Sequence, residues 1–135
     1  MAILGLLSGV LLLGSASSAA DIWQQCIGNT ATNVEWGGCS ATYLKRLDDG
    51  LNAAWKKACA SLDDEQSRAS LLQEQRAWLK FRDASCQYYA NGSFGREGQV
   101  LHFAACRGAI IEARITDLNG VCSTAHQDSN WCETH

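Results

Sequence analysis

LLQEQRAWLKFRDASC, residues 71–86, is the longest stretch of the 135-residue chain with a clean helical period. Apolar side chains that recur at spacings of three and four predict an amphipathic helix. The stretch also carries a tryptophan, arginines and carboxylates, and it ends on a cysteine. We therefore expect it to be the central helix of the domain. Its expected core face comprises Leu71, Leu72, Trp78, Leu79, Arg82 and Cys86.

Two further segments with helical periodicity flank this stretch. Residues 32–35, Thr-Asn-Val-Glu, match a capping box, so a first helix should begin there. The second helix should span about 64–89 and the third about 97–118, where Asn119-Gly120 is a stop signal. The apolar stripes of the first and third helices are Leu44, Leu47, Leu51, Trp55 and Ala58, and Val100, Leu101, Ala104, Ile110 and Ala113.

These helices predict an all-α fold, a small three-helix up-down-up bundle stapled by disulfides. No strand-like alternation is sustained, and the chain contains no proline. Residues 21–31 are interpreted as a polar lead-in to the first helix. We expect one helical domain over residues 21–120, followed by an irregular, cysteine-containing tail at 121–135.

Residues 1–20, MAILGLLSGVLLLGSASSAA, have the composition of a secretory signal peptide. They contain no charged side chain, and an apolar run from Ile3 to Leu13 is followed by small residues. Ser18-Ala19-Ala20 suits a cleavage site before Asp21. The alternative is an uncleaved anchor, but an 11-residue apolar run is short for a membrane span. We therefore expect a periplasmic or secreted protein with no stable membrane insertion after cleavage.

All seven cysteines follow this segment, and such a density in an exported domain is typical of disulfides. Cys86 and Cys106 lie ten residues on either side of Arg96, so in an antiparallel helix pair they sit at the same height. Cys26 and Cys39 flank the start of the first helix and can pin the lead-in onto it. Each bridge should stabilise the fold by about 3 kcal/mol.

Three cysteines remain after these two pairs. The ends of the first and third helices lie at the same end of an up-down-up bundle, so Cys59 can meet Cys122 or Cys132. Alternatively, Cys122 pairs with Cys132 across the tail. One thiol must stay free or pair between chains.

The chain carries no catalytic or cofactor motif. No G-x-S-x-G, P-loop, dinucleotide fingerprint or HExxH occurs, and no CxxC or Cys/His spacing suits redox work or zinc. His102 and Cys106 could form a dyad one turn apart, but Cys106 is expected in a disulfide. The net charge of −3, without a basic run, argues against nucleic acid. We expect a non-enzyme without metal or cofactor, and the oligomeric state stays open.

Arg82 should lie near the core, because it shares a helix face with Gln75 and Cys86. A buried guanidinium needs a carboxylate partner, since an unpaired buried charge is costly. Asp48, on the inner side of the first helix with Leu51, is the candidate. We interpret this pair as a clamp between helices and not as an active-site arginine.

The 71–86 stretch and its surroundings resemble the DUF1311 family, which includes the lysozyme inhibitor LprI and related periplasmic proteins. The resemblance covers about residues 26–118, and Trp55 replaces the usual tyrosine of the family. By this resemblance the pattern residues are structural and not catalytic. They are Asp48, Leu51, Asn52, Gln75, Arg76, Trp78, Phe81, Arg82, Asp83, Cys86, Cys106 and Arg114.

The resemblance implies a protein that binds lysozyme and blocks the groove in which two carboxylates cleave peptidoglycan. The alternative is a periplasmic binding or accessory module for another envelope partner. An inhibitor of this kind needs a rigid protrusion, and the loop 91–98, NGSFGREG, is the most protrusion-like segment. Its Phe94 and Arg96 are candidate partner-binding residues, because an aromatic with an arginine is typical of interface hot spots.

Overall fold

A computed structural model describes residues 16–126 of the chain. Four helices account for most of this range: α1 (Ala19–Gly28), α2 (Asn33–Ser61), α3 (Glu65–Ala84) and α6 (Phe103–Ala125). Two short helices, α4 (Gln87–Ala90) and α5 (Gly95–Glu97), and the π-helical turn η1 (Gly98–His102) connect α3 to α6. No strand occurs within residues 16–126, so the fold is all-α as predicted.

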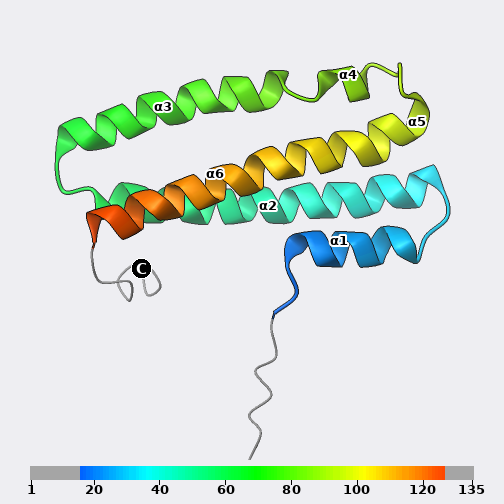
Figure 1. Ribbon diagram of the computed structural model, residues 1–135, viewed down its shortest axis with the longest axis horizontal. Helices are drawn as coiled ribbons and strands as arrows, with labels where there is room; N and C mark the ends of the chain where they lie inside the picture. The colour runs from blue at the N-terminus through cyan, green and yellow to red at the C-terminus, as the bar shows by residue number, and fades with distance from the viewer. Residues whose placement is uncertain (1–15, 127–135) are drawn as a thin grey trace, which may run out of the picture.

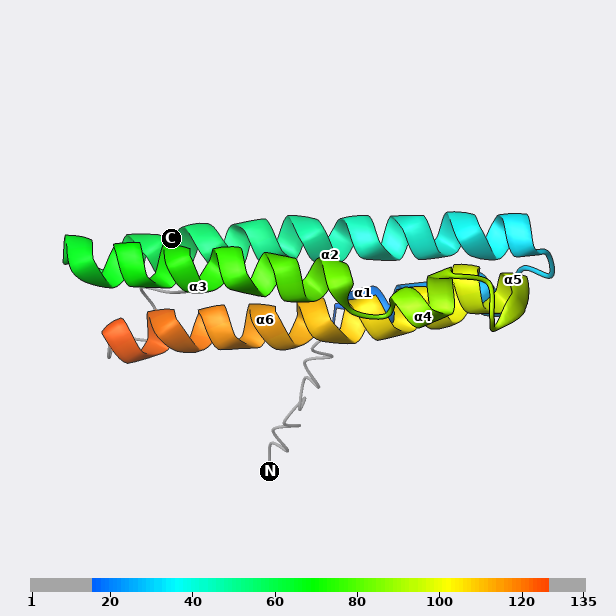
Figure 2. The ribbon, with the colours of Figure 1, turned by 90° about the horizontal axis from the view of Figure 1, so that it is seen from above.

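The three long helices run up, down and up, which confirms the predicted bundle (Figure 1). α2 and α6 are neighbours along most of their length, and they make the most extensive contact in the molecule. The view from above shows α3 running beside this pair (Figure 2). α1 lies antiparallel to α2 and adds a fourth helix that the sequence did not predict.

The segment expected as a polar lead-in, residues 21–31, is mostly helical, so that prediction was wrong. The Ser18 hydroxyl accepts from the Asp21 N–H, and the Asp21 carboxylate accepts from the Ser18 N–H, both over 3.1 Å. This capping box satisfies backbone donors that would otherwise lack partners. Hydrogen bonds from the side chain and backbone of Ser18 lower the pKa of the Asp21 carboxyl group. Sequence reasoning assigned Ser18 to a cleavage site and therefore missed the cap.

The second predicted capping box forms as expected at the start of α2. The Thr32 hydroxyl accepts from the Glu35 N–H over 3.3 Å, and the Glu35 carboxylate accepts from the Thr32 N–H over 3.1 Å. The Thr32 hydroxyl also donates to the Glu35 carboxylate over 2.7 Å, and this bond, with those from the Ala31 and Thr32 N–H groups, lowers the pKa of Glu35. α2 therefore begins where the sequence predicts.

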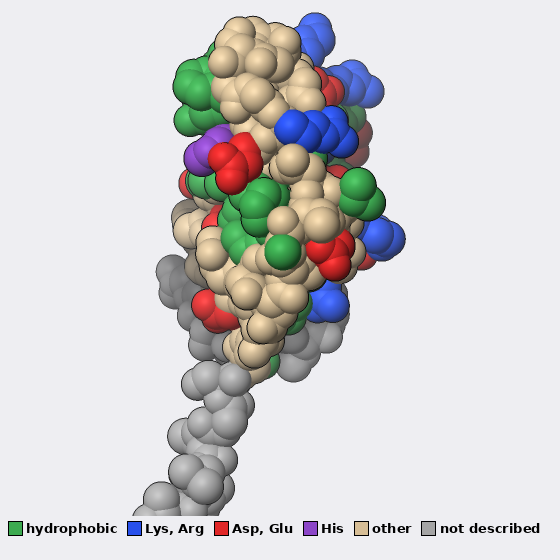
Figure 3. Space-filling view, turned by 90° about the vertical axis from the view of Figure 1, so that its right-hand side faces the viewer, with side chains coloured by type: hydrophobic (Ala, Val, Ile, Leu, Met, Phe, Trp, Pro, Cys, Tyr) green, Lys and Arg blue, Asp and Glu red, His purple; other side chains and the backbone are tan. Residues whose placement is uncertain are grey.

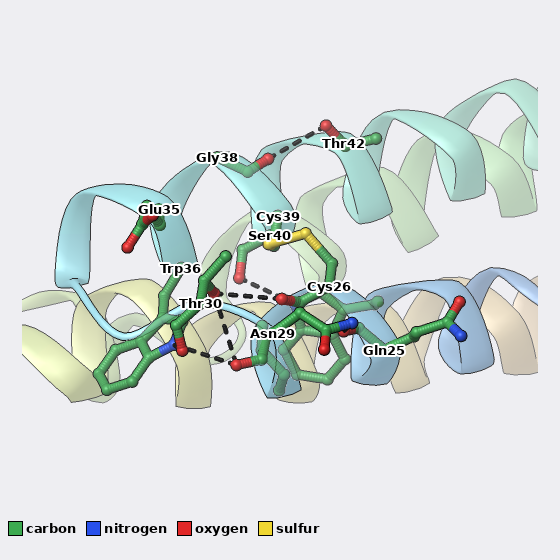
Figure 4. Close-up of a disulfide and its surroundings, with 12 residues drawn as sticks. Gln25, Cys26, Asn29, Thr30, Glu35, Trp36, Gly38, Cys39, Ser40 and Thr42 are labelled. Atoms are coloured by element: carbon green, nitrogen blue, oxygen red, sulfur yellow. Dashed lines mark hydrogen bonds between the residues drawn. A yellow bond between two sulfur atoms is a disulfide. The ribbon is translucent and has the colours of Figure 1, made fainter.

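Two disulfides join the pairs that the sequence predicts. Cys26–Cys39 links α1 to α2, with the Cα atoms 5.8 Å apart (Figure 4). Cys86–Cys106 links the end of α3 to α6, with the Cα atoms 6.0 Å apart. The first bond attaches the N-terminal helix to the bundle, and the second closes the connection between α3 and α6.

The remaining cysteines divide into one free and one bonded residue within the described range. Cys59 is a free thiol, which excludes its pairing with a tail cysteine. Burial raises the pKa of this thiol. Cys122 is buried and disulfide-bonded, and Cys132 lies outside the described residues.

The side chain of Trp23 docks α1 onto α2. Its ring stacks on the ring of Tyr43 with 4.8 Å between centroids, and its Nε1–H donates to Ser40 Oγ over 3.1 Å. Ser40 in turn donates to the Val100 carbonyl over 2.6 Å. One buried hydrogen-bond chain therefore connects α1, α2 and η1.

The core lies between α2 and α6, where a glycine permits a close approach. The Tyr43 ring lies over Gly108, and a Cβ at that position would be 2.6 Å from Cζ of the ring. Tyr43 is only 4% exposed, and its hydroxyl donates to Glu112 Oε1 over 3.3 Å. Burial and the charge of Glu112 raise the pKa of Tyr43 to about 12. The buried apolar residues around this contact include Leu47, Leu51, Ala54, Ala58, Ala104, Ile111 and Leu118.

α6 continues beyond the stop signal predicted at Asn119-Gly120. The helix ends at Ala125, so residues 121–125 of the expected irregular tail are helical. Leu118 and Cys122 are both buried on one face of α6, whereas Gly120 lies on its exposed side. The packing of this face outweighs a glycine that costs a helix about 1 kcal/mol.

The buried face of α6 also differs in register from the prediction. It passes through Ile111, and not through Ile110 and Ala113, which are half-buried and exposed. Arg114 is buried on this face. The prediction considered apolar residues alone and so left out the buried arginine. The predicted register of the α6 core face was therefore wrong.

Residues 71–86 do not form the central helix that the sequence predicted. Within Glu65–Ala84, only Leu71 and Gln75 are buried. Leu72, which was expected on the core face, is 39% exposed. The centre of the bundle is the α2–α6 pair, and α3 lies at its side.

The chain leaves the helical path at Cys86, where the second helix was expected to continue to Tyr89. Cys86 has a φ of 67°, in the left-handed region, and α4 begins after it. This conformation costs a residue other than glycine about 1–2 kcal/mol. Burial of Cys86 and its covalent bond to Cys106 keep the residue in place.

Gly108→Ala is expected to destabilise the fold by about 1–3 kcal/mol, because the added Cβ overlaps the buried ring of Tyr43. Gly120→Ala is the matched control in the same helix, since no described atom lies within 4 Å of its Cβ position. The control should leave stability unchanged or raise it by up to about 1 kcal/mol. Urea unfolding followed by circular dichroism measures both. Equal effects of the two substitutions would contradict the close α2–α6 contact.

Candidate functional site

The connection between α3 and α6 forms one end of the bundle, and we call residues 87–102 the tip (Figure 1). Its turn follows from the local sequence. Gly92 and Gly95 have φ values of 91° and 68°, which glycine adopts at little cost. The side-chain oxygen of Asn91 accepts from the Ser93 N–H over 3.0 Å. The tip thus contains the predicted loop in a defined conformation.

Four rings gather at the tip. Tyr89 lies at the centre of the group, with its centroid 4.4 Å from that of Tyr88, 5.0 Å from that of Phe94 and 5.6 Å from that of His102. Tyr88 and Phe94 are 54% and 55% exposed. Hydrophobic side chains share this end of the molecule with charged ones (Figure 3). The tip therefore presents aromatic surface to solvent.

The tip is held in shape by short-range contacts. Gln99 Nε2 donates to the Ala90 carbonyl over 3.2 Å and so ties η1 back to α4. Gly98 is buried, and a Cβ at its position would lie 2.5 Å from Cβ of Phe94 and 3.3 Å from the Tyr89 carbonyl oxygen. This glycine lets the two sides of the tip close on each other. The Cys86–Cys106 bond closes the base of the tip.

The two partner-binding residues predicted from the sequence both lie on the surface of the tip. Arg96 is exposed, and its Nη1–H donates to the neutral Oε1 of Gln99 over 3.0 Å. No described carboxylate pairs with Arg96, so its charge stays available to a partner. Sequence reasoning missed Tyr88 and His102 as members of this surface. The adjacent aromatics just before the glycine-rich turn were the available signal.

α3 is attached to α6 through a buried guanidinium. The side chain of Arg114 is 6% exposed, and its Nε–H donates to Gln75 Oε1 over 2.9 Å. Its Nη1–H donates to the carboxylate of Glu74, and the guanidinium lies 5.9 Å from the ring centroid of Trp78. All three partners belong to α3. One cation therefore sets the position of this helix against α6.

A second and more exposed clamp joins α3 to α2. Arg82 Nη1 lies 3.5 Å from Asp48 Oδ1, the carboxylate predicted as its partner. Arg82 is 21% exposed and also donates through Nε to the neighbouring Asp83 over 3.0 Å. Arg82 is thus partly buried, and Arg114 is more deeply buried.

α2 and α3 leave an open cleft of about 510 Å³ between them, which we call the α2–α3 cleft. Most of the family-pattern residues on these two helices line it, together with three large apolar side chains. Sequence reasoning treated the pattern residues as structural and predicted no cavity here. The lining residues are Asp48, Leu51, Asn52, Gln75, Arg76 and Arg82, with Trp55, Leu72 and Leu79.

A smaller cleft of about 300 Å³ lies between α1 and α2. Its lining includes Trp23, Tyr43 and both cysteines of the Cys26–Cys39 bond. These groups already hold α1 against α2. We interpret this cleft as part of the helix attachment.

Within residues 16–126, no three His, Cys, Asp or Glu side chains are grouped to hold a metal ion. Cys106, considered beside His102 as a dyad, is bonded to Cys86. The lowered carboxyl pKa values belong to helix caps, such as Asp64, where hydrogen bonds from Ser67 lower the pKa.

The protein is therefore a small, disulfide-bonded helical domain with an exposed tip and an open cleft. The sequence model of the family described as lysozyme inhibitor LprI matches residues 26–118. The chain therefore belongs to the LprI lysozyme inhibitor family, which confirms the resemblance seen in the sequence. No curated protein and no solved structure matches the chain.

Membership of this family gives the protein a coarse function. At the family level that function is inhibition of lysozyme, with lysozyme as the protein partner, and it is not catalysis. Proteins of this family are generally periplasmic or extracellular. No helix within residues 16–126 is long and apolar enough to cross a bilayer.

Glu74→Gln is expected to destabilise the protein by about 1–3 kcal/mol, because it leaves the buried Arg114 guanidinium without a carboxylate. Glu65→Gln is the matched control on the same helix. Glu65 is 92% exposed and pairs at 3.5 Å with Arg68, itself 41% exposed, so its loss should cost at most about 0.5 kcal/mol. Urea unfolding of both variants tests this. A Glu74→Gln cost as small as that of the control would show that Arg114 does not depend on this carboxylate.

Proposed function

We propose that this protein inhibits lysozyme by placing its tip in the substrate groove of the enzyme. The observation that carries the proposal is the exposed aromatic cluster on a covalently closed tip. Phe94 and Tyr88 offer aromatic area in a preset arrangement, so little conformational entropy is lost when they bind. Rigid aromatic anchors beside an arginine are the composition of energetic hot spots.

Arg96 gives the tip a group that matches the chemistry of the target. Lysozyme cleaves with two carboxylates in its groove. A guanidinium without a carboxylate partner of its own can donate two parallel hydrogen bonds to a carboxylate. Arg96 on the tip therefore suits a groove that carries negative charge at its centre.

The net charge of the whole chain favours association with lysozyme. Its formal net charge is −3, and lysozymes of the common type are basic. Opposite net charges raise the association rate at low ionic strength. An acidic body that carries one exposed cation at its tip can be attracted to a basic enzyme and still present a cation to its catalytic carboxylates.

Phe94→Ala combined with Arg96→Ala is expected to leave the fold intact and to weaken inhibition at least tenfold. Both side chains are exposed, so their loss opens no cavity in the core. The matched control is Phe81→Ala combined with Lys80→Ala on α3, since Phe81 is 57% exposed and lies outside the tip. A turbidity assay of cell-wall lysis, run with several lysozyme types, measures inhibition. If the tip variant inhibits lysozyme as well as the unmodified protein does, the tip is not part of the interface with lysozyme.

We also propose that residues 1–20 are a signal peptide and that the exported protein begins at Asp21. The apolar run and the small residues before Asp21 support this cleavage site. Edman sequencing of protein recovered from the periplasm or medium should start at Asp-Ile-Trp. An N-terminus upstream of Ser18 would keep the cap of α1 and would contradict the proposed site.

A further inference from the structure

The α2–α3 cleft is a second candidate binding site, separate from the tip. None of its lining residues belongs to residues 87–102. The lining runs from Asp48 to Trp55 on α2 and from Leu72 to Arg82 on α3. At a rise of about 1.5 Å per residue, these segments are about 10 Å and 15 Å long. This length fits an extended peptide of three to four residues at about 3.3 Å per residue.

Part of the cleft lining is apolar and partly exposed to solvent. Leu72 is 39% exposed, and Trp55 and Leu79 are half-buried. Leu51 is buried at the α2 wall. An apolar side chain of a ligand would remove this surface from water, at about 25 cal/mol for each Å² that is buried.

The cleft lining also includes an arginine that forms no ion pair within residues 16–126. Arg76 lines the cleft and is exposed, and no described residue forms an ion pair or hydrogen bond with it. Arg82, by contrast, already faces Asp48 and Asp83. The free guanidinium of the cleft is therefore that of Arg76. Its planar fork matches a carboxylate and can bind it through two hydrogen bonds.

Hydrogen-bonding groups for a peptide backbone lie along the same walls. The side chain of Asp48 is 50% exposed, although its Oδ1 is buried and lies 3.5 Å from Arg82 Nη1. Asn52 lines the cleft without a described hydrogen-bond partner. Arg76 and Arg82 are six positions apart, which is about 9 Å along α3. A ligand that reaches from Arg76 to Asp48 therefore has the length of two to three peptide units.

We propose that the α2–α3 cleft binds a short peptide through its C-terminal carboxylate, with Arg76 holding the carboxylate and Trp55, Leu72 and Leu79 holding an apolar terminal side chain. N–H groups further along the peptide face Asp48 and Asn52. This site does not rest on the proposed lysozyme contact, because it uses a different surface and a ligand of a different size.

The test uses the full exported chain and two matched probes, acetyl-Ala-Ala-Leu with a free carboxylate and the same peptide as its carboxamide. Titration followed by ¹⁵N–¹H NMR should shift amide signals of residues 48–55 and 72–82 with the carboxylate peptide. The carboxamide should bind at least tenfold more weakly, because it cannot form the charge-assisted pair with Arg76.

Arg76→Gln should lower the affinity for the carboxylate peptide at least tenfold. It should leave the affinity for the carboxamide peptide unchanged. Lys80→Gln is the matched control, since it removes a cation one turn away on α3 that does not line the cleft. It should bind both probes as the unmodified protein does. Arg76 is exposed and unpaired, so its substitution should not unfold the chain.

Three results would overturn the proposal: equal affinity for the two peptides, unchanged carboxylate binding by Arg76→Gln, or amide shifts confined to residues outside the cleft. Absence of binding by either peptide at millimolar concentration would overturn it as well. None of these readouts involves lysozyme, so they are independent of the turbidity assay on the tip variants.

Discussion

The guanidinium of Arg114 is the interaction on which the arrangement of the third long helix depends. α3 buries little apolar surface, since only Leu71 and Gln75 within Glu65–Ala84 are buried. Hydrophobic packing alone would position such a helix weakly. A buried cation is different, because it requires its partners at fixed distances. Gln75, Glu74 and Trp78 must therefore face α6, and this fixes both the rotation and the height of α3.

A helix held by polar clamps does not have to be close-packed along its whole length. α2 and α6 meet closely where Tyr43 lies over Gly108, and their core is apolar. α3 is instead fixed by Arg114 to α6 and by Arg82 to α2. The space left between α2 and α3 becomes the α2–α3 cleft. The two candidate surfaces thus arise from two different kinds of restraint, charge pairs for the cleft and a disulfide for the tip.

Local signals in the sequence predicted the parts of the structure that local chemistry decides. The Thr32–Glu35 capping box starts α2, and equal spacing about Arg96 places Cys86 opposite Cys106. Helical spacing and the cost of an unpaired buried charge pointed to the Asp48–Arg82 pair. The partner-binding role of Phe94 and Arg96 stays a prediction. These predictions needed no knowledge of which helix is central.

The errors came from long-range packing that a periodic pattern does not contain. The pattern at residues 71–86 was clean, yet a clean stripe does not reveal how much of it is covered. The α6 register was misassigned because its buried face includes Arg114, and the stop at Gly120 was overridden by burial of the turns on either side. The α2–α3 cleft was missed because a cavity depends on the spacing between helices.

The Cys86–Cys106 bond makes the tip a closed covalent ring. Exposed, glycine-containing turns are preferred sites of proteolytic cleavage, and the tip contains such a turn between Asn91 and Gly95. A single cut anywhere in residues 87–105 would leave both new ends attached to the bundle through the sulfur bridge. Two cuts would be needed to release a fragment. A protease that cuts the tip once would therefore leave both halves of the tip attached to the bundle.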